Sequence, residues 1–311
     1  MKKNIYILLA FCAFTLGGCA DKDKLGEPIA INDEYQLPQL GASKADNDRI
    51  LALKGTYGSY FLYNVTQKDF EWTQSSGTGS SSSIDSIVLG KPEHVGLMLD
   101  FINDIWLKYY PESFKKKGGL LYRVIMADRI QRRRPGTGFP PGQEYLFSNL
   151  KINGKGITIA GMNANLATMS KADKIVRRND LQVALLQYYI ANKLLDIPNA
   201  FYNVSDYVTV PATPVNVVNS DNQKAYRARG FLPSSYTAVG NPGEWYYGTY
   251  AWTTAKSNDL SSYLLNLTQR TDAEMAPYLK YPLIKQKFDI LINHFKTKYN
   301  FDVRAMANDR Y

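Results

Sequence analysis

Histidine and cysteine are scarce in this sequence, which contains two of each among its 311 residues. Both cysteines, Cys12 and Cys19, lie close to the N-terminus, so the remainder of the chain cannot form a disulfide and must be stabilised by a packed core. The histidines, His94 and His294, are far apart in sequence, and nothing in their spacing indicates that they share a metal ion. We therefore expect no cofactor.

The sequence also lacks the short motifs of several enzyme classes. It contains no G-x-S-x-G nucleophile elbow and no glycine-rich phosphate-binding loop. The paired carboxylates of a glycosidase have no fixed spacing, so that class stays open but has no support. The formal net charge of +9 favours acidic surfaces, but the basic residues are spread too widely to predict nucleic-acid binding.

The first residues have the order of features that is typical of a lipoprotein signal peptide. Lys2 and Lys3 precede an apolar run, residues 5–16, which is too short for a stable membrane span. A lipobox, Leu16-Gly17-Gly18-Cys19, follows this run. We expect cleavage before Cys19 and lipidation of its thiol, so that a lipid anchor holds the protein on a membrane.

We expect one main domain behind this anchor. Residues 1–18 form the predicted signal peptide, residues 19–47 the lipidated N-terminus and a polar linker, and residues 48–311 the domain. Hydrophobic spacing predicts strands at residues 57–63, 120–127 and 156–160 and helices at residues 98–109, 180–198 and 284–295. The fold class indicated is α+β with a small sheet.

The helix predicted at residues 180–198 is apolar on nearly every face. Asp180 is a suitable N-cap, and Pro198 closes the segment. A helix of this kind belongs inside a fold, with other elements packed on several sides. We therefore expect it to be the central buried helix of the domain.

A cluster of arginines precedes a turn rich in glycine and proline. Arg129, Arg132, Arg133 and Arg134 lie just before residues 135–142. Such runs are most often solvated loops, but guanidinium groups also bind carboxylates through pairs of parallel hydrogen bonds. We treat this basic loop as a candidate surface for an acidic partner or a peptide carboxylate.

Several segments of the domain resemble a family of zinc metallohydrolase lipoproteins linked to substrate import in Bacteroidetes-type bacteria. Residues 57–63, YGSYFLY, resemble the opening of that family, and residues 230–236, GFLPSSY, resemble a later segment. Residues 299–306, YNFDVRAM, are similar to its closing segment. Pro198 and Phe201 keep the frame that follows the family's zinc-binding helix.

The zinc-binding motif of that family, HExxH, is missing here. Counting back from Pro198 places its five positions on residues 185–189, so Leu185 and Tyr189 stand where the family has histidines and Leu186 where it has glutamate. In HExxH two histidines on one helical face bind zinc, and the glutamate activates its water. Leucine offers no lone pair, and a tyrosine phenol has an ordinary pKa of about 10.

A second segment of the family's site is also incomplete. Where the family has EDFAE, this sequence has residues 243–247, GEWYY, and under either of two placements the final acid is absent. The resemblance therefore implies a zincin-like metallopeptidase scaffold whose metal site is lost. The degenerate ligand positions are Leu185, Leu186, Tyr189 and Tyr247.

The aromatic residues of these two segments are candidates for ligand binding in place of catalysis. Flat rings with polar tips suit stacking on sugars or clasping of peptides. The candidate ligand-binding residues are Tyr188, Tyr189, Glu244, Trp245, Tyr246 and Tyr247. The alternative is that the rings fill the volume of the former site and form plain core.

The family's usual setting implies a role in nutrient uptake, beside SusC/SusD-type TonB-dependent transporters that import oligopeptides or glycans. Asp21 and Asp23, which follow Cys19, resemble a tag for export to the cell surface. We expect a lipoprotein of the outer membrane that faces the exterior and captures substrate or docks on the transporter as a pseudoenzyme. Two alternatives stay open: a peptidase or glycosidase with unrecognised catalytic residues, and a purely structural subunit.

Overall fold

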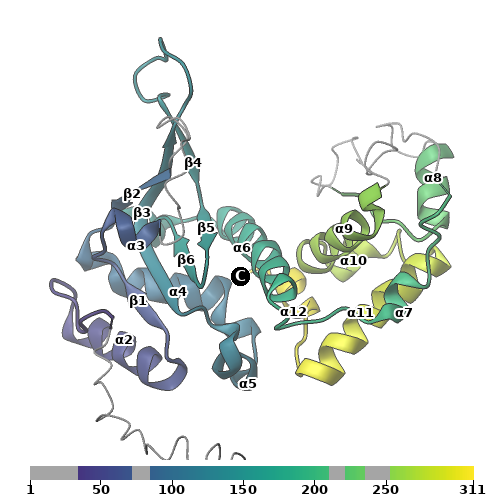
Figure 1. The fold of residues 1–311 in the computed structure, drawn as a ribbon, viewed down its shortest axis with the longest axis horizontal. Helices are drawn as coiled ribbons and strands as arrows, with labels where there is room; N and C mark the ends of the chain where they lie inside the picture. Colours follow the sequence, from purple (N-terminus) through teal and green to yellow (C-terminus); the bar gives the residue numbers. More distant parts are fainter. Residues whose placement is uncertain (1–33, 72–84, 210–220, 235–252) are drawn as a thin grey trace, which may run out of the picture. The chain divides into compact units, whose positions relative to one another are not determined.

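The computed structural model describes residues 34–71, 85–209, 221–234 and 253–311 (Figure 1). By its internal contacts the chain divides into residues 1–36 and residues 37–311, and the account below concerns the second unit. This unit begins before the boundary predicted at Asp48, because Ser43 caps a helix by accepting a hydrogen bond from the backbone N–H of Asp46. No helix in the described ranges is both long and apolar enough to cross a membrane.

The sheet is built around one long strand, β3 (Arg123–Arg133). Along its first half β3 pairs in parallel with β1 (Tyr60–Leu62) and β6 (Gly156–Ile159), and β5 (Leu150–Asn153) runs antiparallel to β6. Along its second half β3 pairs antiparallel with β2 (Asp85–Leu89) and β4 (Tyr145–Ser148). The predicted α+β class with a small sheet is confirmed, and the sheet is mixed.

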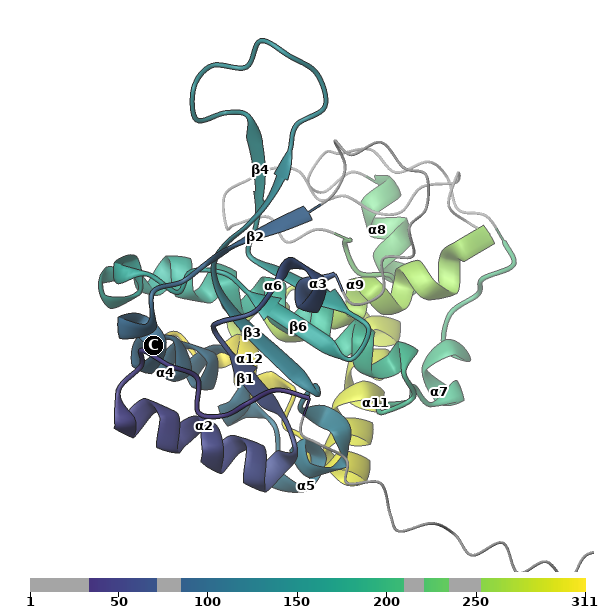
Figure 2. The same cartoon turned by 60° about the vertical axis from the view of Figure 1, so that its left-hand side comes forward.

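The two halves of β3 differ in their surroundings. The first half, from Arg123 to Ala127, is buried throughout, as is β6, which is typical of parallel strands covered on both faces. The register then shifts opposite Val88 and Leu89, and beyond this irregularity most of β3 is open to solvent. There β3 and β4 form a hairpin that projects away from the neighbouring elements (Figure 2).

Helices make up the remainder of the unit. The long ones are α2 (Lys44–Tyr57), α4 (Val95–Ile105), α6 (Lys171–Ala191), α9 (Ala255–Gln269) and α11 (Pro282–Tyr299). The short ones are α3 (Gln67–Phe70), α5 (Glu112–Phe114), α7 (Asn199–Tyr202), α8 (Asp221–Ala228), α10 (Asp272–Met275) and α12 (Arg304–Asn308). Because α6 contacts α4, α9 and β5, it is the element that joins the sheet to the C-terminal helices (Figure 1).

The central helix α6 starts and ends earlier than the sequence predicts. The hydroxyl of Ser170, rather than Asp180, caps it by accepting a hydrogen bond from the backbone N–H of Asp173 at 3.0 Å. The helix ends at Ala191, well before Pro198, because the chain leaves the helical conformation at Lys193, whose φ is 59°. The predicted helix is therefore present, but its polar first turns and its early end are not visible in the hydrophobic pattern.

The strand predicted at residues 57–63 is also shorter than expected. Tyr57 is the last residue of α2, and Gly58 follows with a φ of 73°. Glycine adopts this left-handed conformation without steric cost, so the helix stops there and the chain turns into β1. The remaining predicted elements correspond to α4, β3, β6 and α11.

Candidate ligand-binding pocket

Three of the residues at the HExxH positions belong to the core of the domain. Leu185 and Leu186 are fully buried on α6, and Tyr189 is fully buried beside them. All three belong to the largest cluster of buried apolar side chains, which runs from α4 through α6 to α9 and α11. Their surroundings are therefore those of packed side chains and offer no open space.

The phenol of Tyr189 has protein partners on both sides. It donates a hydrogen bond to the backbone carbonyl of Gly119 at 2.6 Å and accepts one from the indole N–H of Trp106 at 3.2 Å. The rings of Tyr110 and Phe114 pack edge-on against it at 5.5 and 5.1 Å between centroids. Burial raises the pKa of Tyr189 well above its ordinary value, so the phenol stays neutral.

Tyr188, the neighbour of Tyr189, lies in a different environment. It is half-buried and lines a surface pocket of about 480 Å³. Burial raises the pKa of Tyr188 as well, so its phenol is a neutral hydrogen-bonding group. We call this cavity the Tyr188 pocket. Of the two candidate tyrosines on α6, the structure thus places one in a pocket and the other in the core.

The Tyr188 pocket is assembled from four segments that are distant in sequence. Its lining consists of Tyr57, Gly58, Ser59, Lys116, Gly118, Leu120, Leu121, Tyr122, Lys155, Tyr188, Asn192 and Leu194. Gly118 has a φ of 94° in the single π-helical turn Lys115–Gly119, which joins α5 to β3. This turn and the two chain reversals at Gly58 and Lys193 bring tyrosine and lysine side chains to one opening.

Glu112, a carboxylate in contact with the lining residue Tyr57, is already engaged. Glu112 forms an ion pair with Lys115 and accepts a hydrogen bond from the phenol of Tyr57 at 2.6 Å. The hydrogen bonds from Lys115 and Tyr57 lower the pKa of Glu112 below its ordinary value, and the charge of Lys116 adds to this effect. Lys116 and Lys155 are exposed, so the mouth of the pocket is cationic.

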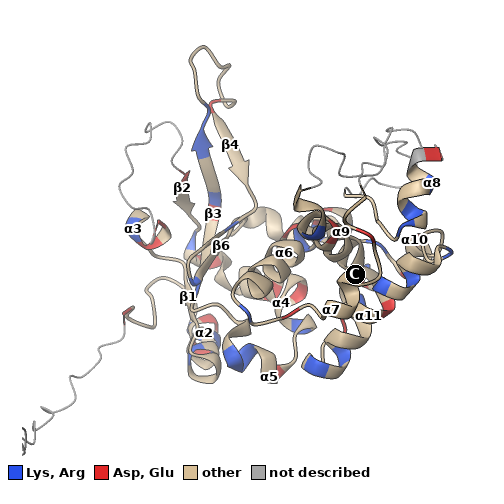
Figure 3. Ribbon diagram, turned by 45° about the vertical axis from the view of Figure 1, so that its right-hand side comes forward, with Lys and Arg blue, Asp and Glu red and all other residues tan. Residues whose placement is uncertain are grey.

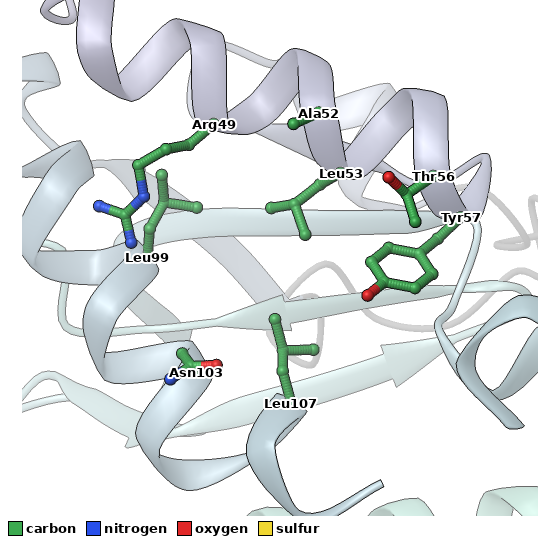
Figure 4. Close-up of a pocket in the computed structure, with 8 residues that line it drawn as sticks. All are labelled: Arg49, Ala52, Leu53, Thr56, Tyr57, Leu99, Asn103 and Leu107. Carbon is green, nitrogen blue, oxygen red and sulfur yellow. The ribbon is translucent and has the colours of Figure 1, made fainter. Parts of the chain in front are cut away.

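A second pocket lies between α2 and α4 (Figure 4). It measures about 340 Å³, and apolar side chains such as Leu53, Leu99 and Leu107 line its middle. Its cation, Arg49, is paired with Asp100 at 2.6 Å. Because the charged group of this pocket is satisfied within the protein, it is a weaker candidate for a ligand site.

The remaining candidate ligand residues lie outside the described part of the chain. Glu244, Trp245, Tyr246 and Tyr247 belong to residues 235–252, and Cys19 belongs to residues 1–33. Their predicted roles in ligand binding and lipidation therefore stay predictions. Within the described ranges, no group of three or more histidine, cysteine, aspartate or glutamate residues is placed to hold a metal ion.

The two histidines have separate surroundings. The Nε2 atom of His294 on α11 lies 3.1 Å from a carboxylate oxygen of Asp196. The Nε2 atom of His94, just before α4, lies 3.7 Å from a carboxylate oxygen of its neighbour Glu93. The structure therefore places the two imidazoles on different elements with different partners.

The segment of arginines predicted as a basic loop is a strand instead. Arg129, Arg132 and Arg133 belong to β3, and only Arg134 lies in the turn beyond it (Figure 3). The sequence did not predict this because the strand continues past its buried half as part of the exposed hairpin. Two of the arginines bind neighbouring carboxylates at 3.2 Å, Arg129 to Asp128 and Arg132 to Asp85.

The register of the hairpin separates these arginines between its two faces. Arg133 stands opposite Tyr145, and Gln131 stands opposite Phe147, so these side chains share one face with Arg129. Phe147 is 57% exposed and Tyr145 is 37% exposed on this face. We call Arg129, Arg133, Tyr145 and Phe147 the hairpin face.

A buried ionic centre between α9 and α11 was not predicted from the sequence. The ammonium of Lys287 is fully buried, pairs with the carboxylate of Asp259 and donates hydrogen bonds to Ser205 at 3.1 Å and to the carbonyl of Gly230 at 3.2 Å. Burial lowers the pKa of Lys287 and raises that of Asp259, because each ion is costly away from water. In the sequence, the position of Lys287 on the apolar face of the predicted C-terminal helix is the one feature that could have indicated this buried ion pair.

Comparisons with known proteins give one weak structural likeness. No protein-family model matches the sequence, and no curated protein matches it. A similar solved structure is the crystal structure described as "a putative zinc-binding metallo-peptidase from Bacteroides caccae". The two chains are 10% identical, the likeness covers 86% of this chain and 95% of that one, and the TM-score is 0.43. A likeness this weak assigns no role to any residue of this chain.

Proposed function

We propose that the protein is a non-catalytic lipoprotein that captures an oligosaccharide or oligopeptide for a SusC/SusD-type outer-membrane transporter, on a zincin-like scaffold without a zinc site. The observation that carries this proposal is the contrast between neighbouring residues of α6. Leu185, Leu186 and Tyr189 are core residues, whereas Tyr188 lines an open pocket. The same helix therefore offers a binding surface but no metal ligands at these positions.

The size and lining of the Tyr188 pocket support capture of a small part of a polymer. Its volume of about 480 Å³ lies in the range of small-molecule sites, which are commonly about 300–1,000 Å³. Tyr57, Tyr122 and Tyr188 supply aromatic faces and neutral phenols, and Asn192 supplies an amide. Such groups bind a flat or hydroxylated ligand without the entropy cost of ordering long chains.

Capture is tested by titrating the full-length protein with neutral and acidic oligosaccharides and with mixed oligopeptides. We expect micromolar to millimolar binding of one class, and we expect Tyr188→Ala to weaken it about two- to tenfold, because stacking on an aromatic ring contributes about 0.5–1.5 kcal/mol. Tyr145→Ala is the matched control, since Tyr145 lies on the hairpin and not in the pocket. Turnover of any of these compounds by the purified protein, lost with a single acidic substitution, contradicts the proposal.

The hairpin face supports docking on a partner. The hairpin projects from the neighbouring elements (Figures 1 and 3). Arg133 is exposed on this face, and so is the ring of Phe147. Arginine and aromatic side chains dominate the energetically important positions of protein interfaces. We propose that this face binds an acidic patch of the transporter.

Docking is tested by purifying the tagged protein from outer membranes of its own organism and identifying what accompanies it. We expect a SusC/SusD-type pair to copurify and to be lost when Arg133 and Phe147 are both replaced by alanine. A variant with Leu40→Ala and Lys171→Ala, which changes one exposed apolar and one exposed basic residue elsewhere, is expected to retain the pair. Repeated recovery of the protein without such a pair would falsify this assignment.

A further inference from the structure

We infer that the Tyr188 pocket binds an acidic sugar, holding its carboxylate with Lys116 and Lys155 while the ring lies against tyrosine side chains. This inference rests on the proposed function and names the class of ligand that is captured. It follows from three observations: the charge of the lining, the state of the nearby carboxylate, and the aromatic groups that share the opening.

The lining of the pocket contains positive charge and no negative charge. Lys116 and Lys155 are its ionisable members apart from the tyrosines, and both are exposed. Neither ammonium lies within ion-pair distance of a carboxylate of the described residues. Two cations at the mouth of a concave site attract an anion and concentrate field lines there.

Glu112, which contacts the lining residue Tyr57, is paired with Lys115 and not with Lys116 or Lys155. Glu112 is held by the ammonium of Lys115 and by the phenol of Tyr57. These two hydrogen bonds lower the pKa of Glu112, and the positive charge of Lys116 lowers it further. One carboxylate cannot neutralise both Lys115 and Lys116. The turn Lys115–Gly119 thus presents surplus positive charge to solvent.

The pocket between α2 and α4 provides an internal comparison. It is similar in size, and Tyr57 lines both cavities. There, however, the single cation Arg49 is bound to Asp100, so no charge is left for a ligand. The difference identifies the Tyr188 pocket as the one prepared for an anion.

The remaining lining favours a sugar over an extended peptide. Peptides are commonly bound by addition of a strand to a row of unpaired backbone groups. The residues lining the Tyr188 pocket come from four separate segments, and three tyrosines and Asn192 are among them. A pyranose ring that carries a carboxylate matches this set, because its faces stack, its hydroxyls hydrogen-bond and its acid group reaches the lysines.

The test compares tetragalacturonate with its methyl ester, which has the same rings without the charges. Calorimetric titration of the full-length protein is expected to give at least tenfold tighter binding of the acid than of the ester. The double variant Lys116→Gln, Lys155→Gln is expected to weaken acid binding about a hundredfold and ester binding little, since each lysine donates a charge-assisted hydrogen bond to the carboxylate and none to the ester. Lys171→Gln, Lys280→Gln is the charge-matched control outside the pocket.

Each outcome decides a different point. Equal binding of acid and ester, weakened by Tyr188→Ala, overturns the acidic ligand but leaves capture intact. Lysine-dependent binding of a peptide ending in glutamates, with no binding of tetragalacturonate, overturns the sugar assignment. Absence of binding to every probe overturns both the inference and capture, and retention of the acid preference in the lysine double variant overturns the role of Lys116 and Lys155.

Discussion

At the scale of single residues, the buried ammonium of Lys287 is held by many partners. Besides its partner Asp259, four aromatic rings surround it, with Phe201 and Tyr263 both at 4.6 Å from the nitrogen. Gly230, which accepts one of its hydrogen bonds, has a φ of 85°, and a Cβ atom there would lie 2.8 Å from the Ser205 hydroxyl. The centre therefore couples α9 and α11 to the segment around residue 230.

We predict that Lys287→Met lowers the free energy of unfolding by about 3–5 kcal/mol, because it leaves the Asp259 carboxylate buried without its cation. Urea denaturation monitored by circular dichroism measures the change. The double variant Lys287→Met, Asp259→Leu removes both ions and is expected to recover most of the loss. If the double variant is as unstable as the single one, packing rather than the unpaired charge is responsible.

A second prediction separates the two tyrosines of α6. Tyr189→Phe removes a phenol with two hydrogen bonds, so we expect the free energy of unfolding to fall by about 1–2 kcal/mol while ligand binding is unchanged. Tyr188→Ala is expected to weaken ligand binding, and because its half-buried ring packs against the core it is also expected to lower the free energy of unfolding. Thermal denaturation and ligand titration of both variants check this, and a loss of binding in Tyr189→Phe would show that the two sites are not separate.

At the scale of elements, the segment after α12 is tied through Asp309 to α6 and to the 3-10 turn Leu107–Tyr109 that follows α4. Its carboxylate binds the ammonium of Lys108 at 2.6 Å, and its backbone carbonyl accepts a hydrogen bond from the buried guanidinium of Arg178 on α6. Burial acts to raise the pKa of Asp309. The hydrogen bonds from Lys108, the backbone N–H of Tyr311 and the phenol of Tyr109 outweigh burial and lower the pKa to about 2.

This tie predicts a loss of stability in acid. Because the pKa of Asp309 is lower in the folded protein than its ordinary value of 3.8, its contribution is complete above pH 4 and is lost as the pH falls toward 2. We expect Asp309→Asn to cost about 1 kcal/mol at pH 6, after allowance for solvent screening, and about a third of that at pH 2.5, where the folded carboxylate is still partly ionised. Denaturant titrations at the two pH values measure the difference, and an equal cost at both would exclude the ionised carboxylate as the cause.

At the scale of the whole molecule, the sequence predicted what depends on local chemistry. Apolar spacing located α4, α6 and α11, and the arrangement of Val124 to Ala127 indicated a buried strand. The predicted ends of helices and strands were wrong where the backbone conformation of one residue sets the end, as at Gly58 and Lys193. No short-range pattern marks such positions.

The candidate site could be predicted only in part for a related reason. Tyr188 was named from its place in a helix, but its pocket partners come from segments separated by many residues, and only tertiary packing brings Lys116 and Lys155 to the same opening. The pairing of Lys287 with Asp259 was equally invisible, because neither charge occurs in a motif. Tyr188 and Tyr189 are consecutive residues of α6, so their rings point in different directions from the helix axis. The amino-acid composition of the segment does not show which ring faces the pocket.

The continuity of β3 has a mechanical consequence. The strand runs without a hinge loop from the middle of the buried sheet into the hairpin and ends at Arg133, before the turn at the tip. A force on the hairpin therefore acts directly on the hydrogen bonds that join β3 to β1 and β6. Because these strands are parallel to β3, the force shears all of these hydrogen bonds together and does not break them one at a time. A partner that binds the hairpin is therefore connected through β3 to the centre of the sheet, and the strands paired with β3 resist a force applied by that partner.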